Sequence, residues 1–213
     1  MSQRGIGAVG LGGFAVILLA ALIEPLWNWP PTEASGEEVA AYIGDNRGAT
    51  IASILLYTVG MALMLVFCLA LRSRFAHDER VPAGLANAFG AGAVSLVSVV
   101  YVGFAPALVL AYRAPDVGAA QELRDLSFGV LALSGVPTAI CLGAFALIVL
   151  RAEVLPRVTA WFAVFGAIAH VAILGSFVPR TGFFSLEGFV IVAIPATMFF
   201  WLLVTSAALV RER

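Results

Sequence analysis

The sequence has no lysine, only two cysteines and two histidines, and few charged residues of any kind. Charged residues make up 12% of the 213 residues, against about 25% in an average soluble domain. This scarcity excludes a soluble protein of ordinary composition. Cys68 and Cys141 both lie within apolar runs, which argues against a structural disulfide, and two cysteines with two histidines match no typical zinc motif. We expect no metal, no cofactor and no nucleic-acid partner.

What the sequence does contain is long apolar runs. Hydrophobic residues make up 62% of the chain, and its mean hydropathy is +1.01. A helix needs roughly 20 apolar residues to cross about 30 Å of hydrocarbon. Six runs reach that length, at residues 5–24, 49–71, 82–112, 126–150, 158–179 and 188–210. The pattern predicts an all-α protein, a single domain built as a polytopic bundle of six transmembrane helices.

The basic residues are all arginine and are unevenly distributed between the loops. If the N-terminus is cytoplasmic, eight of the twelve lie inside, and only Arg47, Arg113, Arg124 and Arg180 lie outside. This bias follows the positive-inside rule. The lack of lysine, with abundant alanine, glycine and valine, is also typical of a GC-rich bacterial genome. We therefore expect a multi-pass protein of the bacterial cytoplasmic membrane with both termini in the cytoplasm.

The longest outer loop contains a helix-start signal. Residues 35–38 read Ser-Gly-Glu-Glu, a capping-box pattern in which the Ser35 hydroxyl and the Glu38 carboxylate each accept a hydrogen bond from a backbone N–H group. The pattern predicts a short interfacial helix that extends to about Ile43, ends at Gly44 and covers the outer ends of the membrane helices.

Small and polar residues recur at helical spacing within the membrane runs. Five glycines between residues 5 and 13 match a nucleotide-binding fingerprint, but no strand precedes them, so we interpret them as a surface for close helix packing. Polar seams in the second, third and fourth runs should face the bundle interior, as a pocket or as interhelical hydrogen bonds. These seams are Ser53, Tyr57 and Cys68; Asn87, Ser95, Ser98 and Tyr101; and Ser134, Thr138 and Cys141. Pro106, Pro137 and Pro195 should each interrupt a helix.

His170 is the only ionisable side chain deep within an apolar run. Small residues precede it on its helix face, so it should point into the bundle, where an unpaired imidazole would be costly. We predict a hydrogen-bond partner among Glu24, Tyr57, Tyr101 and Glu187. A carboxylate partner would favour the charged imidazolium and indicate a functional site, whereas a hydroxyl or a backbone carbonyl would indicate a structural histidine.

These features favour a non-enzymatic bundle that binds a lipid or another hydrophobic ligand from the outer side, beneath the helix over residues 35–43. The candidate ligand-binding residues are His170, Glu24, Glu187, Arg180, Tyr57, Tyr101 and Ser98. One alternative is an intramembrane enzyme in which an outer carboxylate orients His170 as a general base, although no catalytic motif accompanies it. Another alternative is a transporter, a homo-oligomer or an accessory subunit of a membrane complex.

Three segments resemble uncharacterised six-helix membrane proteins of actinobacteria. They are residues 37–47, with the acidic start of the outer helix and Asn46-Arg47; residues 177–184, Phe-Val-Pro-Arg-Thr-Gly-Phe-Phe; and residues 201–206, followed by a terminal arginine pair. The resemblance implies the fold, and no activity or catalytic residue is established for that group. In size and helix number the chain is also similar to the substrate-binding subunits of energy-coupling-factor vitamin transporters, but its first helix lacks their Ala-x-x-x-Ala docking motif.

Overall fold

The computed structural model describes residues 2–23, 28–113 and 117–211, and every regular element within these ranges is a helix. In chain order the helices are α1 (Gln3–Ile23), α2 (Gly36–Ala76), α3 (Ala83–Arg113), α4 (Val117–Leu133), α5 (Gly135–Ala152), α6 (Arg157–Ala172), the 3-10 helix η2 (Ile173–Phe177) and α7 (Val190–Arg211). Six helical stretches within the described ranges are long and apolar enough to cross a membrane; α4 with α5 forms one of them, and α6 with η2 another. The predicted all-α bundle is confirmed.

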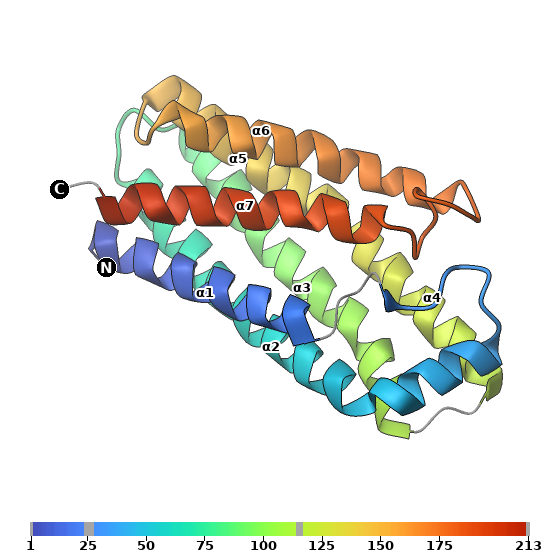
Figure 1. Cartoon of the computed structure of the whole chain (residues 1–213). Helices are drawn as coiled ribbons and strands as arrows, with labels where there is room; N and C mark the ends of the chain where they lie inside the picture. The colour runs from blue at the N-terminus through green and yellow to red at the C-terminus, as the bar shows by residue number, and fades with distance from the viewer. Residues whose placement is uncertain (1, 24–27, 114–116, 212–213) are drawn as a thin grey trace.

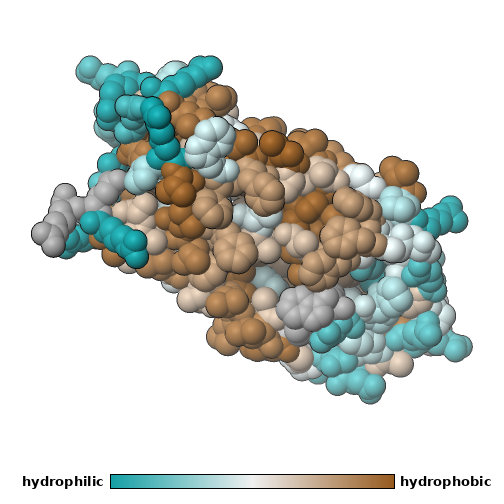
Figure 2. Space-filling view, turned by 45° about the horizontal axis from the view of Figure 1, so that its top comes forward, coloured by the Kyte–Doolittle hydropathy of each residue, from teal (hydrophilic) through white to brown (hydrophobic). Residues whose placement is uncertain are grey.

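The surface agrees with a membrane location. In Figure 2, hydrophobic residues cover the middle of the visible face, and hydrophilic residues gather at its two ends. Several large apolar side chains project outward from the helices, among them Leu22 at 69%, Ile168 at 67% and Phe165 at 63% exposure. Such a belt would be unstable in water and matches the hydrocarbon region of a bilayer.

Helix α2 begins with the predicted capping box. The Ser35 hydroxyl accepts from the backbone N–H of Glu38 at 3.3 Å, and the Glu38 carboxylate accepts from the backbone N–H of Ser35 at 2.8 Å. The predicted end at Gly44 is wrong, because α2 is 41 residues long and passes through Gly44 without a break. One glycine costs a helix only about 1 kcal/mol, whereas Val39 and Ile43 are buried in the core. The outer segment is therefore an extension of a membrane helix and not a separate interfacial helix.

The fourth predicted span is divided into α4 and α5 at Ser134. Pro137 lies one turn further on, lacks an N–H donor and crowds the carbonyl four residues earlier, which prevents a continuous helix. The Ser134 hydroxyl instead donates to the carbonyl of Leu131 at 2.6 Å. Pro106 and Pro195 lie inside α3 and α7 without ending either helix, so among the three prolines only Pro137 lies next to a helix boundary.

Both ends of the described chain lie at one end of the bundle. The first turn of α1 and the last turn of α7 are side by side at the left of Figure 1, and we call this the terminal end. Here Gly7 and Gly10 of α1 pack against Ser206 of α7, and further along Gly13 faces Gly60 of α2. The predicted glycine surface is confirmed at Gly7, Gly10 and Gly13 and is wrong at Gly12, which no neighbouring helix among the described residues approaches. Because α2 and α7 cover the confirmed part, a second copy of the chain would need another surface.

The opposite end, which we call the loop end, holds the segments 28–35 and 178–189. Towards it, α1 and α7 diverge (Figure 1). The terminal half of the bundle is filled by interlocked aromatic rings, which keep the helices together there. The tightest pair is Phe145 and Trp201, with ring centroids 5.0 Å apart in an edge-to-face arrangement, and Phe67 and Phe89 also pack on Trp201.

Candidate functional site

A cavity of about 240 Å³ lies where α1 and α7 diverge, and every helix from α1 to α7 contributes to its wall. Most of its lining is apolar: Phe14, Ile17, Leu18, Ala21, Met61, Leu96, Val100, Phe104, Leu131, Ile191, Val192, Pro195, Ala196, Met198, Phe199 and Phe200. The polar lining residues are Tyr57, Ser134, Thr138 and His170. Neither carboxylates nor arginines occur among these lining residues, so the cavity is electrically neutral apart from the histidine.

The cavity opens sideways between α1 and α7. Leu18 of α1 and Phe200 of α7 line it, and both are also exposed on the outer surface of the bundle, at 47% and 54%. Leu18 and Phe200 belong to the apolar belt, so the opening faces the hydrocarbon region. No residue of the outer segment 35–43 lines this cavity, so the expected entry beneath that segment is not the opening seen here.

Helix α6 carries His170 to the inner wall of the cavity. Ala163, Gly166 and His170 occupy the buried face of α6, and His170 is only 2% exposed, which confirms that it points into the bundle. Trp161 on the other face is 61% exposed. The carbonyl of His170 lies against Gly135 at the start of α5, where any side chain would overlap it.

The hydrogen-bond partner of His170 differs from the predicted one. Its Nδ1 atom lies 2.8 Å from the carbonyl oxygen of Gly166, one turn earlier in the same helix. A carbonyl can only accept, so Nδ1 carries the proton, and in a neutral imidazole Nε2 is then an acceptor. By the criterion stated above, a backbone carbonyl indicates a structural hydrogen bond and not a charged catalytic pair.

Two hydroxyls at the junction of α4 and α5 lie on the same wall. The Thr138 hydroxyl donates to the carbonyl of Ser134 at 2.7 Å, and the Ser134 hydroxyl donates to the carbonyl of Leu131. Both residues belong to the predicted polar seam of this span, so its inward orientation is confirmed. The seam of α2 is likewise buried, and it contributes Tyr57, whose ring packs on Phe104 with centroids 5.8 Å apart.

The predicted polar seam of α3 is wrong at Ser95 and Ser98, whereas Asn87 and Tyr101 make hydrogen bonds to α2, as one of the two alternatives expected. Ser95 and Ser98 are exposed on the outside of the bundle, and Leu96 and Val100 take the inward positions. Tyr101 is half-buried, but its hydroxyl donates to the carbonyl of Thr58 at 3.0 Å and ties α3 to α2. Apolar side chains could take the inward face because lipid is as apolar as the bundle interior and does not drive polar groups inward.

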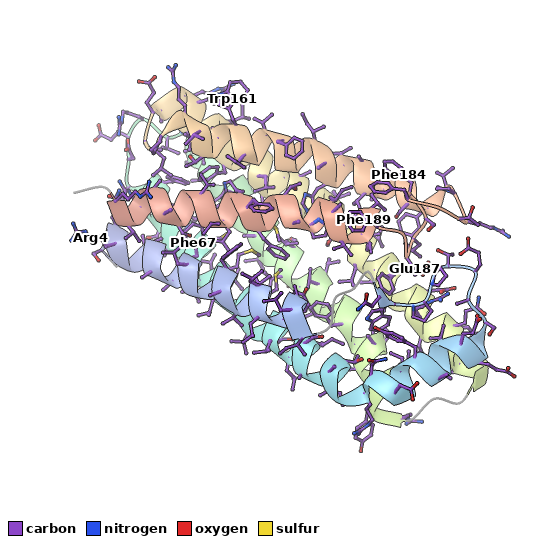
Figure 3. The ribbon with its side chains drawn as sticks, viewed as in Figure 1. Arg4, Phe67, Trp161, Phe184, Glu187 and Phe189 are labelled. Carbon is purple, nitrogen blue, oxygen red and sulfur yellow. The ribbon has the colours of Figure 1, made fainter. Side chains whose placement is uncertain are left out.

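The other predicted site residues that the structure describes lie away from His170. Arg180 is exposed in the segment between η2 and α7, and Glu24 lies outside the described residues. Glu187 has a buried side chain and accepts a hydrogen bond from the Thr32 hydroxyl at 2.6 Å. In Figure 3 it lies beside the segment 28–35, above α4. Of the six predicted positions that the structure describes, only His170 and Tyr57 line the cavity.

Glu187 belongs to a second polar cluster, at the loop end, whose centre is Arg124. The Arg124 side chain is fully buried and donates to the carbonyls of Pro31 at 2.8 Å and Thr32 at 3.2 Å, and to Asp125 at 2.8 Å. Its Nε atom lies 3.9 Å from Glu187. The cluster connects α4, the segment 28–35 and the segment 178–189. Its role is therefore structural.

Burial raises the pKa of Glu187 above its ordinary value, although the Thr32 hydroxyl and the Arg124 guanidinium act in the opposite direction.

Sequence reasoning missed the role of Arg124. One signal was present, because Arg124 is the only basic residue between Arg113 and Arg151. Sequence reasoning also missed the apolar lining from α1 and α7, which no sequence motif marks.

None of the family models, curated proteins or solved structures compared with this chain matches it. The function therefore has to be argued from the cavity.

Proposed function

We propose that this multi-pass membrane protein binds a lipid or another hydrophobic ligand in the cavity between α1 and α7, without catalysing a reaction. The observation that carries the proposal is a neutral, mostly apolar cavity that opens towards the hydrocarbon region through Leu18 and Phe200. An apolar cavity of about 150 Å³ can hold benzene. The cavity of 240 Å³ therefore has room for a two-ring aromatic compound or part of an acyl chain.

The geometry gives less support to the intramembrane enzyme. A general base needs a group that orients it and a nucleophile within hydrogen-bond reach. His170 is bonded to a backbone carbonyl, Glu187 is bonded to Thr32, and the Ser134 hydroxyl is bonded to its own helix. The polar groups of the cavity are thus arranged as isolated side chains and not as a catalytic set.

The experiment uses adamantane diazirine, an apolar photolabel, with the protein in phosphatidylcholine vesicles. Surface lipid contacts alone would label exposed residues such as Leu22 and Phe165, whereas occupation of the cavity would also label the buried residues Tyr57 and Met61. We expect adducts at both buried positions by peptide mass spectrometry. Adducts confined to exposed residues would overturn the proposal.

A matched pair of substitutions on α1 tests whether those adducts depend on the cavity. Ala21→Trp places an indole in the opening, whereas Ala15→Trp places it on the exposed face of the same helix, away from the cavity. We expect Ala21→Trp to reduce labelling of Met61 several-fold and Ala15→Trp to leave it unchanged. Equal labelling in both variants would show that the label reaches Met61 by another route.

We also propose that the terminal end faces the bacterial cytoplasm, and that the chain belongs with the actinobacterial proteins it resembles. The arginine bias supports this orientation, because Arg47, Arg113, Arg124 and Arg180 are the only arginines assigned to the loop end. The native cysteines are buried, so an impermeant thiol reagent has little background. In intact cells it should label Glu37→Cys and not Ser73→Cys; the reverse result would invert the orientation.

A further inference from the structure

We propose that the ligand of this cavity is a neutral apolar molecule carrying a hydroxyl or another hydrogen-bond donor, and not a ketone, an ester or an acid. The inference rests on the proposed function and specifies the chemical class of the ligand. It follows from the direction of the hydrogen bonds that the polar groups of the wall already make.

Three polar side chains of the wall have used their donor hydrogens. His170 Nδ1 donates to Gly166, the Ser134 hydroxyl to Leu131 and the Thr138 hydroxyl to Ser134. All three acceptors are backbone carbonyls, which have no proton to donate, so these bonds can run only in this direction. The arrangement leaves each of the three residues with acceptor capacity alone: a lone pair on Nε2 of His170 and lone pairs on the two hydroxyl oxygens.

Of the three acceptors, His170 should influence the choice of ligand most, because it lines the cavity and is only 2% exposed. Its Nδ1 edge is turned to its own helix, so the edge that carries Nε2 is the one left for the cavity. Tyr57, the fourth polar lining residue, packs on Phe104 and has a further interaction of its own, so the selection is argued from the other three.

Because the three polar wall residues can only accept hydrogen bonds, the cavity should prefer ligands that donate a hydrogen bond over ligands that only accept one. A carbonyl or an ether oxygen brought against Nε2 would place two lone pairs together, and both groups would lose water without gaining a hydrogen bond. A carboxylate or a phosphate would in addition be a charge without a cation, because no arginine lines the cavity. An alcohol or a phenol supplies the proton that the wall lacks.

The test compares three compounds of one skeleton as competitors of adamantane diazirine labelling at Met61 in wild-type protein. 2-Naphthol donates a hydrogen bond, 2-methoxynaphthalene only accepts, and naphthalene does neither. Concentrations are expressed as those measured within the membrane, so that differences in partitioning cancel. We expect 2-naphthol to halve the labelling at a concentration about three- to tenfold lower than the other two, the gain of one hydrogen bond in an apolar site.

Substitutions of the three polar wall residues test whether they cause the preference for 2-naphthol. His170→Phe should abolish the advantage of 2-naphthol over naphthalene. Ser134→Ala and Thr138→Val should each reduce the advantage, and they serve as the second test if His170→Phe does not fold. Ser98→Ala removes a hydroxyl from the outer surface of α3 and should preserve the preference.

The outcomes separate the two proposals. If 2-naphthol and naphthalene compete equally, or if 2-methoxynaphthalene competes best, the inference is overturned while the proposed function stands. A preference for 2-naphthol that survives all three wall substitutions also overturns it. Absence of any adduct at Met61 overturns the proposed function, and the inference with it.

Discussion

A methyl group at Gly7 should disrupt the contact that holds α1 and α7 together at the terminal end. The new Cβ atom would lie 2.7 Å from the carbonyl oxygen of Ser206 and 2.8 Å from a methyl carbon of Val210. Ordinary contacts of a Cβ atom begin near 3.4 Å, so the helices would have to separate by about 0.7 Å. One of the opposing atoms is backbone and cannot rotate away, so the strain reaches the whole helix.

Gly12 of the same helix provides the matched control, because no atom outside its own helix lies within 4 Å of an added Cβ. Replacing either glycine with alanine gains about 0.5–1 kcal/mol of helix preference, and this gain cancels when the two variants are compared. What remains is overpacking, about 1–3 kcal/mol. At about 2–4 °C per kcal/mol for a chain of this length, Gly7→Ala should melt roughly 2–12 °C below Gly12→Ala.

Cys68 and Cys141 provide the readout. Both are buried free thiols, at 1% and 2% exposure, and neither is among the atoms that an added Cβ at Gly7 or Gly12 would meet. A thiol-reactive dye therefore reports unfolding during a temperature ramp in detergent. Equal melting temperatures for the two alanine variants would refute the argument, because they would show that α1 and α7 do not pack closely at Gly7.

Two further predictions concern the loop end. Burial raises the pKa of Glu187, so the folded protein binds more protons than the unfolded chain between the ordinary value, about 4.3, and the raised one; the free energy of unfolding should fall as pH rises through this window. Glu187→Gln should flatten this slope in melting curves followed by tryptophan fluorescence, and an unchanged slope would contradict the assignment. Ser35→Ala removes one half of the capping box and should cost about 1 kcal/mol, seen as faster amide exchange over residues 36–39, whereas Ser35→Asp should retain protection; equal exchange in the two variants would count against the cap.

Hydropathy predicted the spans well because backbone groups in a bilayer must bond within their own segment, which leaves only helices for runs of this length. The local signals were less reliable: the capping box predicted the start of α2 correctly, but the end predicted at Gly44 was wrong because one glycine does not outweigh the burial of Val39 and Ile43. Periodicity showed which residues share a face and not which face points inward. Ser98 therefore ended outside and Thr138 inside, although both belong to regular polar seams.

The cavity could not be predicted from the sequence, because it depends on how α1 and α7 diverge beyond their glycine contact. The prediction for His170 was limited in a different way. The prediction considered a single hydrogen-bond partner and took a carbonyl partner to indicate a purely structural residue. An imidazole, however, has two nitrogens on separate edges, and each can form its own hydrogen bond. The bond to Gly166 satisfies one edge and fixes the tautomer. The bond that lowers the cost of burying the ring is thus also the one that makes the second edge a defined acceptor, so the structural role of His170 supports the binding role proposed for it.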